Sequence, residues 1–187
     1  MKQNAICNAQ DMNPETCHPE TQNEFFTPHF ALDELTKSAT ARKYGIPNIP
    51  TPEAKDNLRS LCVNSLEPLR EEIDLPVCIT SGFRCKAVNE RITHHSATSQ
   101  HMSGRAADFY IGDNPDSPCG LSRRERLIKA FHLIITSDKI DYDQVILYPT
   151  FIHVSYVSRD KNRHYITKAN GHGHYCNFTR TQALALS

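Results

Sequence analysis

The sequence predicts a single α+β domain in which N-terminal helices pack on one side of a mostly antiparallel sheet. Between residues 32 and 69, apolar side chains recur every three or four positions, which is typical of helices with one buried face. Between residues 76 and 156, short apolar runs alternate in the manner of half-buried strands. Two of these runs are separated by Pro149-Thr150, and a two-residue turn there would make them an antiparallel hairpin. With 187 residues, the chain is long enough to bury the core of one such domain.

The helical region is expected to contain two helices. Leu32 to Tyr44 has helical spacing and ends at Gly45, a residue that commonly terminates helices. The second helix begins at Thr51, a good N-terminal cap, with Pro52 in the first helical position, where its missing N–H is not needed. Pro68 lies inside the apolar pattern of this helix and should kink it.

The strands and later elements follow from similar patterns. Residues 76–81 read as a strand that leads into the loop 82–84, and residues 86–93 read as a short helix. Ser122 and Glu125 form a capping box, which predicts a helix whose apolar face packs on the sheet. Residues 163–168 could add one edge strand.

The two ends of the chain differ in composition from the rest. Residues 1–24 are polar and carry almost no large apolar side chains, so we expect a flexible leader that cannot bury enough surface to become ordered. The domain itself is expected over residues 25–168. Residues 169–187 form a C-terminal tail with a Gly- and His-containing stretch, which could bind metal but is more simply interpreted as a flexible segment.

Charge and hydropathy exclude several classes of partner. Lys plus Arg and Asp plus Glu number 21 each, so the net charge is zero with neutral histidines. This balance argues against binding to nucleic acid or to an anionic membrane. No apolar run approaches the length of a membrane-spanning helix, and the first residues lack the apolar region of a signal peptide. We therefore expect a soluble monomer with no secretory signal of its own.

The chain contains seven cysteines, so at least one thiol is unpaired in a monomer. Cys62 lies on the apolar face of the second helix and reads as a small core residue. Cys78 and Cys85 flank the loop 82–84 and could be bridged there, although a chain that is not secreted usually keeps its thiols reduced. The sequence contains no Cys-x-x-Cys pair, so a second metal site with thiolate ligands is not expected.

Three residues have the pattern of a metal site. Asp108 lies in the apolar strand pattern of residues 106–111, where an unpaired carboxylate would be costly. His153 lies on a second alternating run, residues 151–155, and His101 precedes the first of these strands. Two histidines and one carboxylate are a typical ligand set of catalytic zinc, which keeps its fourth position for water or substrate. We therefore predict that Zn²⁺ binds to His101, Asp108 and His153.

Five motifs together resemble the zinc D-Ala-D-Ala carboxypeptidase family, which shares its fold with the Hedgehog signalling domain and with phage endolysin peptidases. In order along the chain, the matching residues are Ser81-Gly82-Phe83-Arg84, Asn89, Ser99-Gln100-His101 with Gly104, Ala106 and Asp108, Asp143-Gln144-Val145-Ile146, and His153-Val154-Ser155. The resemblance spans about Phe25 to Ser158. It implies a Hedgehog/DD-peptidase fold, zinc on the three predicted ligands and hydrolysis of peptidoglycan stem peptides. A phage or prophage lysis enzyme, released to the cell wall, or a cytoplasmic muropeptide-processing enzyme would fit such a chain.

The resemblance also implies roles for residues around the metal. Arg84 matches the arginine that binds the substrate carboxylate, and a planar guanidinium suits that two-point contact. Without the resemblance, a surface arginine is the simpler interpretation. Ser99 and Gln144 would hydrogen-bond the substrate backbone. The adjacent His94 and His95 invite a catalytic role, and the alternative is a solvated loop.

The expected hairpin departs from the family in its acidic residue. Its turn pairs Tyr148 with Phe151 and Ile146 with His153. The zinc side then carries Gln144, Ile146 and Tyr148. Asp143 should point away. Relatives place the general base three residues before the second zinc histidine or at the position of Tyr148, and here those positions are Thr150 and Tyr148.

This departure leaves two functions open. Zinc alone can bring the pKa of its water near 7, and a positioned acid–base group typically adds about 10²- to 10⁴-fold in rate. A slow hydrolase is one possibility, with Tyr148 stabilising the oxyanion or with His94, His95, His172 or His174 reaching the water. The alternative is a zinc-binding module that recognises cell-wall peptides without cleaving them. A regulatory module of the Hedgehog type is a third, weaker option.

Overall fold

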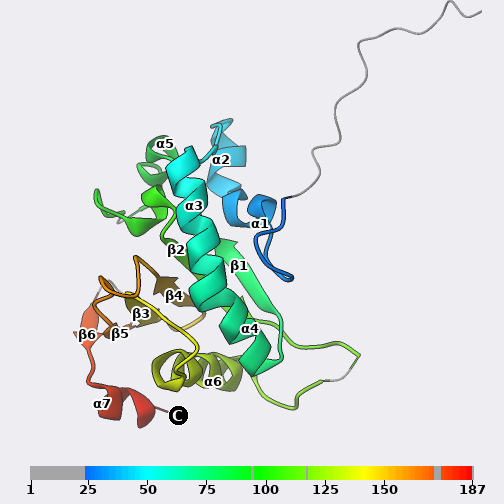
Figure 1. Cartoon of the computed structure of the whole chain (residues 1–187), viewed down its shortest axis with the longest axis vertical. Helices are drawn as coiled ribbons and strands as arrows, with labels where there is room; N and C mark the ends of the chain where they lie inside the picture. The colour runs from blue at the N-terminus through cyan, green and yellow to red at the C-terminus, as the bar shows by residue number, and fades with distance from the viewer. Residues whose placement is uncertain (1–23, 94, 117, 171–173, 187) are drawn as a thin grey trace, which may run out of the picture.

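A six-stranded mixed sheet forms the centre of the computed structural model, which describes residues 24–93, 95–116, 118–170 and 174–186 (Figure 1). Across the sheet, the strands are β1 (Val77–Ser81), β2 (Ala106–Ile111), β4 (Ile152–Ser155), β3 (Gln144–Leu147), β5 (Tyr165–Ala169) and β6 (Tyr175–Asn177). All neighbours are antiparallel except β3 and β5, which are parallel. The predicted α+β class with a mostly antiparallel sheet is confirmed.

Helices precede and interrupt the strands. They are α1 (Leu32–Thr36), α2 (Ala39–Tyr44), α3 (Pro52–Leu61), the π-helical segment η1 (Cys62–Leu66), α4 (Glu67–Ile73), α5 (Lys86–Asn89), the 3-10 turn η2 (Gln100–Ser103), α6 (Arg123–Thr136) and α7 (Arg180–Leu184). None of the helices in the described ranges has the length and apolar character needed to cross a bilayer. Residues 1–23 of the predicted leader, His94 and His172 lie outside the described residues, whereas Glu24, the last residue of that leader, forms ion pairs with Lys55 and Arg59.

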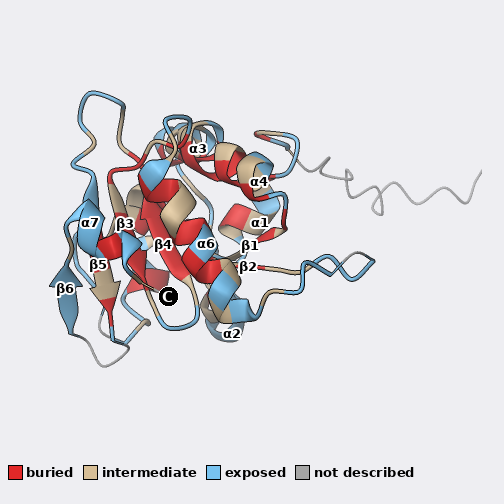
Figure 2. Cartoon of the chain, turned by 90° about the horizontal axis from the view of Figure 1, so that it is seen from below, coloured by how far each residue is buried: buried red, intermediate tan, exposed pale blue. Residues whose placement is uncertain are grey.

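The core lies between one face of the sheet and the helices α3, α4 and α6. Figure 2 shows the buried residues concentrated in the central strands and on one side of these helices, whereas β6 and α7 are mostly exposed. The strands contribute Ala107, Phe109, Val145, Leu147, Ile152 and Val154, and the helices contribute Leu58, Leu61, Leu66, Leu127, Phe131 and Ile134. Alternation along the strands therefore leaves the opposite face of the sheet for polar groups.

The predicted N-terminal helices are present with two differences. Residues 32–44 form two helices, because Ser38 accepts a hydrogen bond from the Ala41 N–H and so caps a new helix. Gly45 ends α2 in the left-handed conformation, as predicted. The distortion expected at Pro68 lies just before that residue, in the π-helical segment η1. Proline has no N–H to donate, and the wider π-helical turn accommodates the missing hydrogen bond.

The C-terminal part adds more structure than the sequence patterns indicated. The strand expected at the sheet edge is β5, but it pairs with β3 on one side and β6 on the other, so it is internal. Helix α7 begins with a capping box formed by Thr179 and Gln182, a signal that was present in the sequence. Cys62, Cys78 and Cys85 are free thiols, so no bridge joins Cys78 to Cys85.

Gly104 brings the turn η2 against the helical layer. It ends η2 with φ of +71°, and a Cβ atom there would collide with the carbonyl oxygen of Ala54 in α3. The Asn57 side chain of α3 also donates a hydrogen bond of 2.9 Å to the Ser103 carbonyl. Only glycine combines this backbone conformation with this close approach. The position of His101, inside η2, is thereby tied to α3.

Candidate metal centre

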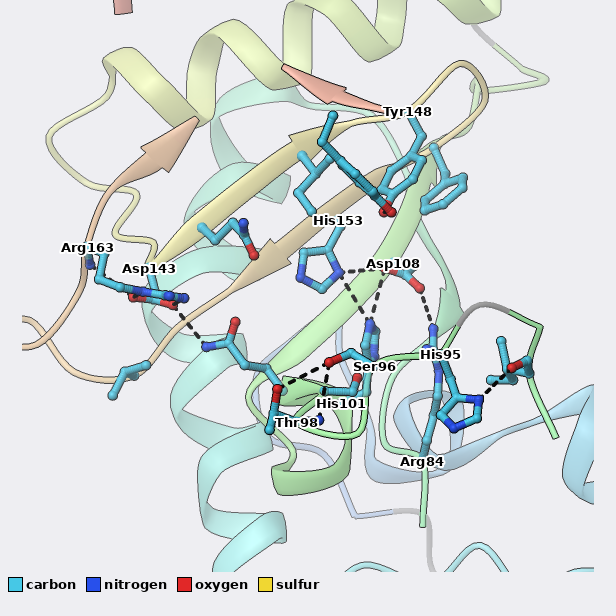
Figure 3. Close-up of a pocket in the computed structure, with 18 of the residues that line it drawn as sticks. Arg84, His95, Ser96, Thr98, His101, Asp108, Asp143, Tyr148, His153 and Arg163 are labelled. Carbon is cyan, nitrogen blue, oxygen red and sulfur yellow. Dashed lines mark hydrogen bonds and ion pairs between the residues drawn. The ribbon is translucent and has the colours of Figure 1, made fainter. Parts of the chain in front are cut away.

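The polar face of the sheet forms the floor of a cavity of about 770 Å³. Strands β2, β3 and β4, the turn η2 and the loop before it contribute to its wall. Figure 3 shows His101, Asp108 and His153 converging in this cavity, with Arg84 on one side and Asp143 and Arg163 on the other. These residues are far apart in the sequence, and the fold brings strand residues, Asp108 and His153, together with residues of turns and loops.

The strand register places two of the three predicted ligands opposite each other. Asp108 of β2 pairs directly with His153 of β4, and His153 pairs with Ile146 of β3 on its other side. The Tyr148 N–H donates to the Phe151 carbonyl at 3.0 Å, which completes the predicted hairpin register. Residues paired in this way share one face of a sheet, so Asp108 and His153 both face the cavity.

Three ligand atoms meet at distances that suit a metal ion. His153 Nδ1 lies 2.8 Å from Asp108 Oδ1, and His101 Nε2 lies 3.3 Å from each of these two atoms. Zinc bound to nitrogen at 2.0–2.1 Å in tetrahedral geometry sets its ligand atoms about 3.3 Å apart. All three residues are buried, and together they could hold a metal ion. The donor set and its spacing therefore fit zinc.

The nitrogen that His101 presents to this cluster is determined by a hydrogen bond on its other side. His101 Nδ1 lies 2.7 Å from the carbonyl oxygen of Gly82, an acceptor that requires the proton on Nδ1. The lone pair of Nε2 then faces Asp108 and His153, as in metal sites where a backbone carbonyl orients the ligand. Burial lowers the pKa of His101, which favours the neutral form that binds metals.

Asp108 is kept ionised by its surroundings. Burial alone would raise the pKa of this carboxyl, but the charges and hydrogen bonds of His101 and His153 outweigh burial and lower the pKa well below its ordinary value. Arg84 Nη2 donates to Asp108 Oδ2 at 2.6 Å, and Arg84 Nε donates to the Ser81 hydroxyl at 2.8 Å. Arg84 therefore lies in the cavity, where it directly orients the Asp108 carboxylate. His101, Asp108 and His153, the three residues that could hold a metal ion, are called the metal cluster below.

Tyr148 lies at the aromatic side of the cavity. Its ring stacks on Phe151 with centroids 4.2 Å apart, and its hydroxyl lies 3.2 Å from that of Tyr175 in β6. Burial and the nearby Tyr175 raise the pKa of Tyr148 above its ordinary value. At neutral pH, Tyr148 therefore keeps its proton and can donate a hydrogen bond, but it cannot act as a base.

The other predicted site residues also line the cavity. His95 does so from an exposed position, with Nδ1 2.9 Å from the Ile92 carbonyl. Ser99 and Gln144 line it too, and within the described residues neither side chain makes a hydrogen bond to protein. Their catalytic and substrate-binding roles remain predictions. Neither Thr150 nor His174 is among the described residues of this lining.

The prediction that Asp143 points away from the metal side was wrong. The strand β3 begins only at Gln144, so the alternation of side chains does not extend to Asp143. Its buried carboxylate lines the cavity and accepts hydrogen bonds from Gln100 Nε2 and from Arg163. Burial alone would raise the pKa of Asp143, but these donors outweigh burial and lower it to about 2.

Gln100 and Arg163 were missed as site residues. Gln100 directly precedes the predicted ligand His101, which was a usable signal. Arg163 lies in an irregular segment 20 residues after Asp143 and has no sequence pattern that connects it with the cavity.

Comparison with known protein families finds a match over part of the chain. The sequence model of the peptidase M15 family matches residues 28–139. This range contains Arg84, His101 and Asp108, whereas Tyr148 and His153 lie beyond it. No curated protein matches the chain.

Proposed function

The chain belongs to the peptidase M15 family, and on this premise we propose that it is a zinc-dependent peptidase that hydrolyses peptidoglycan stem peptides. The observation that carries the proposal is the triangle of His101 Nε2, Asp108 Oδ1 and His153 Nδ1, with sides of 2.8 to 3.3 Å, on the floor of an open cavity. A buried cluster of this composition beside a cavity supports hydrolysis more than a structural metal, which usually has four protein ligands.

His101, Asp108 and His153 would hold the zinc ion. When bound, zinc supplies a Lewis acid and lowers the pKa of a coordinated water to near 7. Arg84 and the Gly82 carbonyl hold two of the ligands in position, so that little rearrangement is needed on binding. The remaining N–H groups of Arg84 can contact a substrate carboxylate, while Ser99 and Gln144 offer hydrogen bonds to its backbone.

Tyr148 is proposed to stabilise the negative charge that develops on the carbonyl oxygen of the substrate. Its raised pKa keeps the phenol protonated, and stacking on Phe151 holds the ring in place. A preorganised donor of this kind is among the larger contributions to catalysis of acyl transfer. His95 remains a candidate for proton transfer because it lines the cavity and is accessible to solvent.

One observation favours a second function, a zinc-bearing module that binds stem peptides without cleaving them. Among the described residues that line the cavity, only Asp108 and Asp143 carry carboxylates. Asp108 belongs to the metal cluster, and the low pKa of Asp143 makes it a weak base. The peptidase is therefore expected to be slow. Release to the cell wall during phage lysis would bring the protein to stem peptides, whether it cleaves them or only binds them.

The deciding experiment uses the zinc-loaded protein with purified stem peptides, with and without a chelator. Mass spectrometry identifies the products, and calorimetry measures binding. Cleavage that the chelator abolishes is the expected result and identifies the bond. Binding without cleavage, by protein that holds one zinc ion per chain, would establish the binding module instead. If the protein neither binds nor cleaves the peptides, both functions are rejected.

A further inference from the structure

Gln100 connects the metal cluster to an ion pair on the opposite side of the cavity, in which Asp143 is buried and Arg163 is partly exposed. Its backbone directly precedes His101 in η2, and its side chain lines the cavity. Gln100 Nε2 donates to Asp143 Oδ2 at 2.9 Å. Figure 3 shows this contact at Asp143, which lies beside Arg163 and away from Arg84.

Asp143 is surrounded by hydrogen-bond donors. Its side chain is fully buried and accepts from the backbone N–H and Nε of Arg163, both at 2.9 Å, and from Nη2 of the same residue. The Ser155 hydroxyl approaches to 3.5 Å. An ionised carboxylate has no proton to donate, so each of its neighbours has to supply one.

This arrangement fixes the orientation of the Gln100 amide. The NH₂ group has to face Asp143, because the reverse orientation would place the Gln100 carbonyl oxygen against a carboxylate oxygen. Gln100 Oε1 is then directed away from Asp143. Within the described residues, Oε1 has no hydrogen-bond partner, although the side chain lines the cavity. The cavity thus contains an oriented acceptor that can be satisfied by a ligand.

We propose that Gln100 is a substrate-positioning residue whose Oε1 accepts a hydrogen bond from a backbone N–H of the bound peptide, held in that orientation by Asp143 and Arg163. This inference rests on the proposed function and adds one recognition contact to it. A peptide substrate offers such N–H groups, whereas an ester at the same position offers only oxygen. The site therefore distinguishes an amide from an ester at one position of the ligand.

The test is a scan of one stem pentapeptide, in which each backbone amide in turn is replaced by an ester. Calorimetry with the zinc-loaded full chain gives the affinity for the parent peptide and each analogue. One analogue is expected to bind the wild type about 3- to 10-fold more weakly than the parent, the usual effect of one neutral hydrogen bond. In Gln100→Leu, the affinity difference between the parent peptide and that analogue is expected to disappear. The differences between the parent and the other ester analogues should be unchanged, and they serve as internal controls.

The Asp143→Asn variant tests whether the orientation of the Gln100 amide matters, because the Gln100 side chain itself remains present. The amide introduced at position 143 can donate to Gln100 Oε1, which would turn the Gln100 amide round and reduce the preference for amide over ester while Gln100 remains. NMR of the Gln100 side-chain NH₂ group checks the orientation without substrate, and its signals should shift in this variant. Unchanged signals would overturn the proposal.

The outcomes separate this inference from the proposed function. If the parent peptide binds but is not cleaved, the peptidase is rejected and the ester scan still tests Gln100. If the parent peptide binds and Gln100→Leu keeps the full preference for the amide, the role of Gln100 is rejected, whether or not cleavage occurs. A wild type that binds no peptide would overturn both.

Discussion

Arg84 and His153 hold opposite oxygens of one carboxylate. Arg84 Nη2 lies 2.6 Å from Asp108 Oδ2, and His153 Nδ1 lies 2.8 Å from Asp108 Oδ1. The carboxylate is therefore fixed between the metal cluster and a guanidinium. This gives Arg84 a structural connection to metal binding in addition to the substrate contact expected from the sequence.

Replacing a ligand histidine should abolish stoichiometric zinc binding. In His101→Ala or His153→Ala, only two of the three donors remain, which is fewer than catalytic zinc sites use. Zinc content after dialysis, measured by mass spectrometry, is the readout. His95→Ala is the matched control, because His95 lies in the same cavity outside the cluster, and it should retain one zinc ion per chain. Full zinc content in His153→Ala would refute the ligand assignment.

Arg84→Ala should weaken zinc binding by about 10- to 100-fold, the usual effect of removing a residue that orients a ligand. It should also raise the KM for peptides with a free carboxylate. Arg84→Lys retains the charge but not the planar fork, so it should recover only part of each effect. Zinc affinity by chelator competition and steady-state kinetics separate the two roles. If neither quantity changes, both roles are wrong.

Tyr148→Phe should lower kcat by about 100-fold and leave zinc binding and KM nearly unchanged, because it removes a donor used in the transition state. The variant keeps the stacking on Phe151. Tyr175→Phe removes the hydroxyl that lies 3.2 Å from that of Tyr148 and should have a smaller effect. Equal kcat in Tyr148→Phe and the wild type would exclude Tyr148 from catalysis.

Asp143 should make stability depend on pH in the acidic range. Its pKa is lowered to about 2 in the folded protein, so its contribution is fully present above its unfolded pKa of about 4 and is lost as the pH falls toward 2. Urea unfolding of the zinc-free wild type and of Asp143→Asn measures the difference in unfolding free energy. That difference should shrink by about 2 kcal/mol between pH 6 and pH 2. A difference independent of pH would contradict the ionised state of Asp143.

Gly104→Ala should destabilise the protein more than Gly45→Ala. Both glycines have positive φ, so either substitution introduces backbone strain of about 1–2 kcal/mol. Nothing lies within 4 Å of a Cβ atom at Gly45, whereas at Gly104 the Cβ atom would collide with the Ala54 carbonyl. Chemical denaturation gives the free energy of unfolding of both variants. Gly45→Ala reports backbone strain alone, and Gly104→Ala reports backbone strain together with the steric clash. Equal destabilisation would show that α3 can move away from η2.

The sequence patterns predicted which face of the sheet carries Asp108 and His153, because that placement depends on strand alternation. Pairing Ile146 with His153 across a two-residue turn was enough to place side chains on the correct face. The same reasoning failed at Asp143, which precedes its strand and whose direction is set by Arg163 and Gln100. Contacts between distant, irregular segments leave no periodic trace in a sequence.

The three predicted ligands come from different layers of the molecule. Asp108 and His153 belong to the sheet, whereas His101 sits on a turn held against α3 by Gly104 and Asn57. An ion bound by all three therefore bridges sheet and helices, and its affinity for the folded state adds directly to the free energy of unfolding. Chelation should thus lower the midpoint temperature of thermal unfolding.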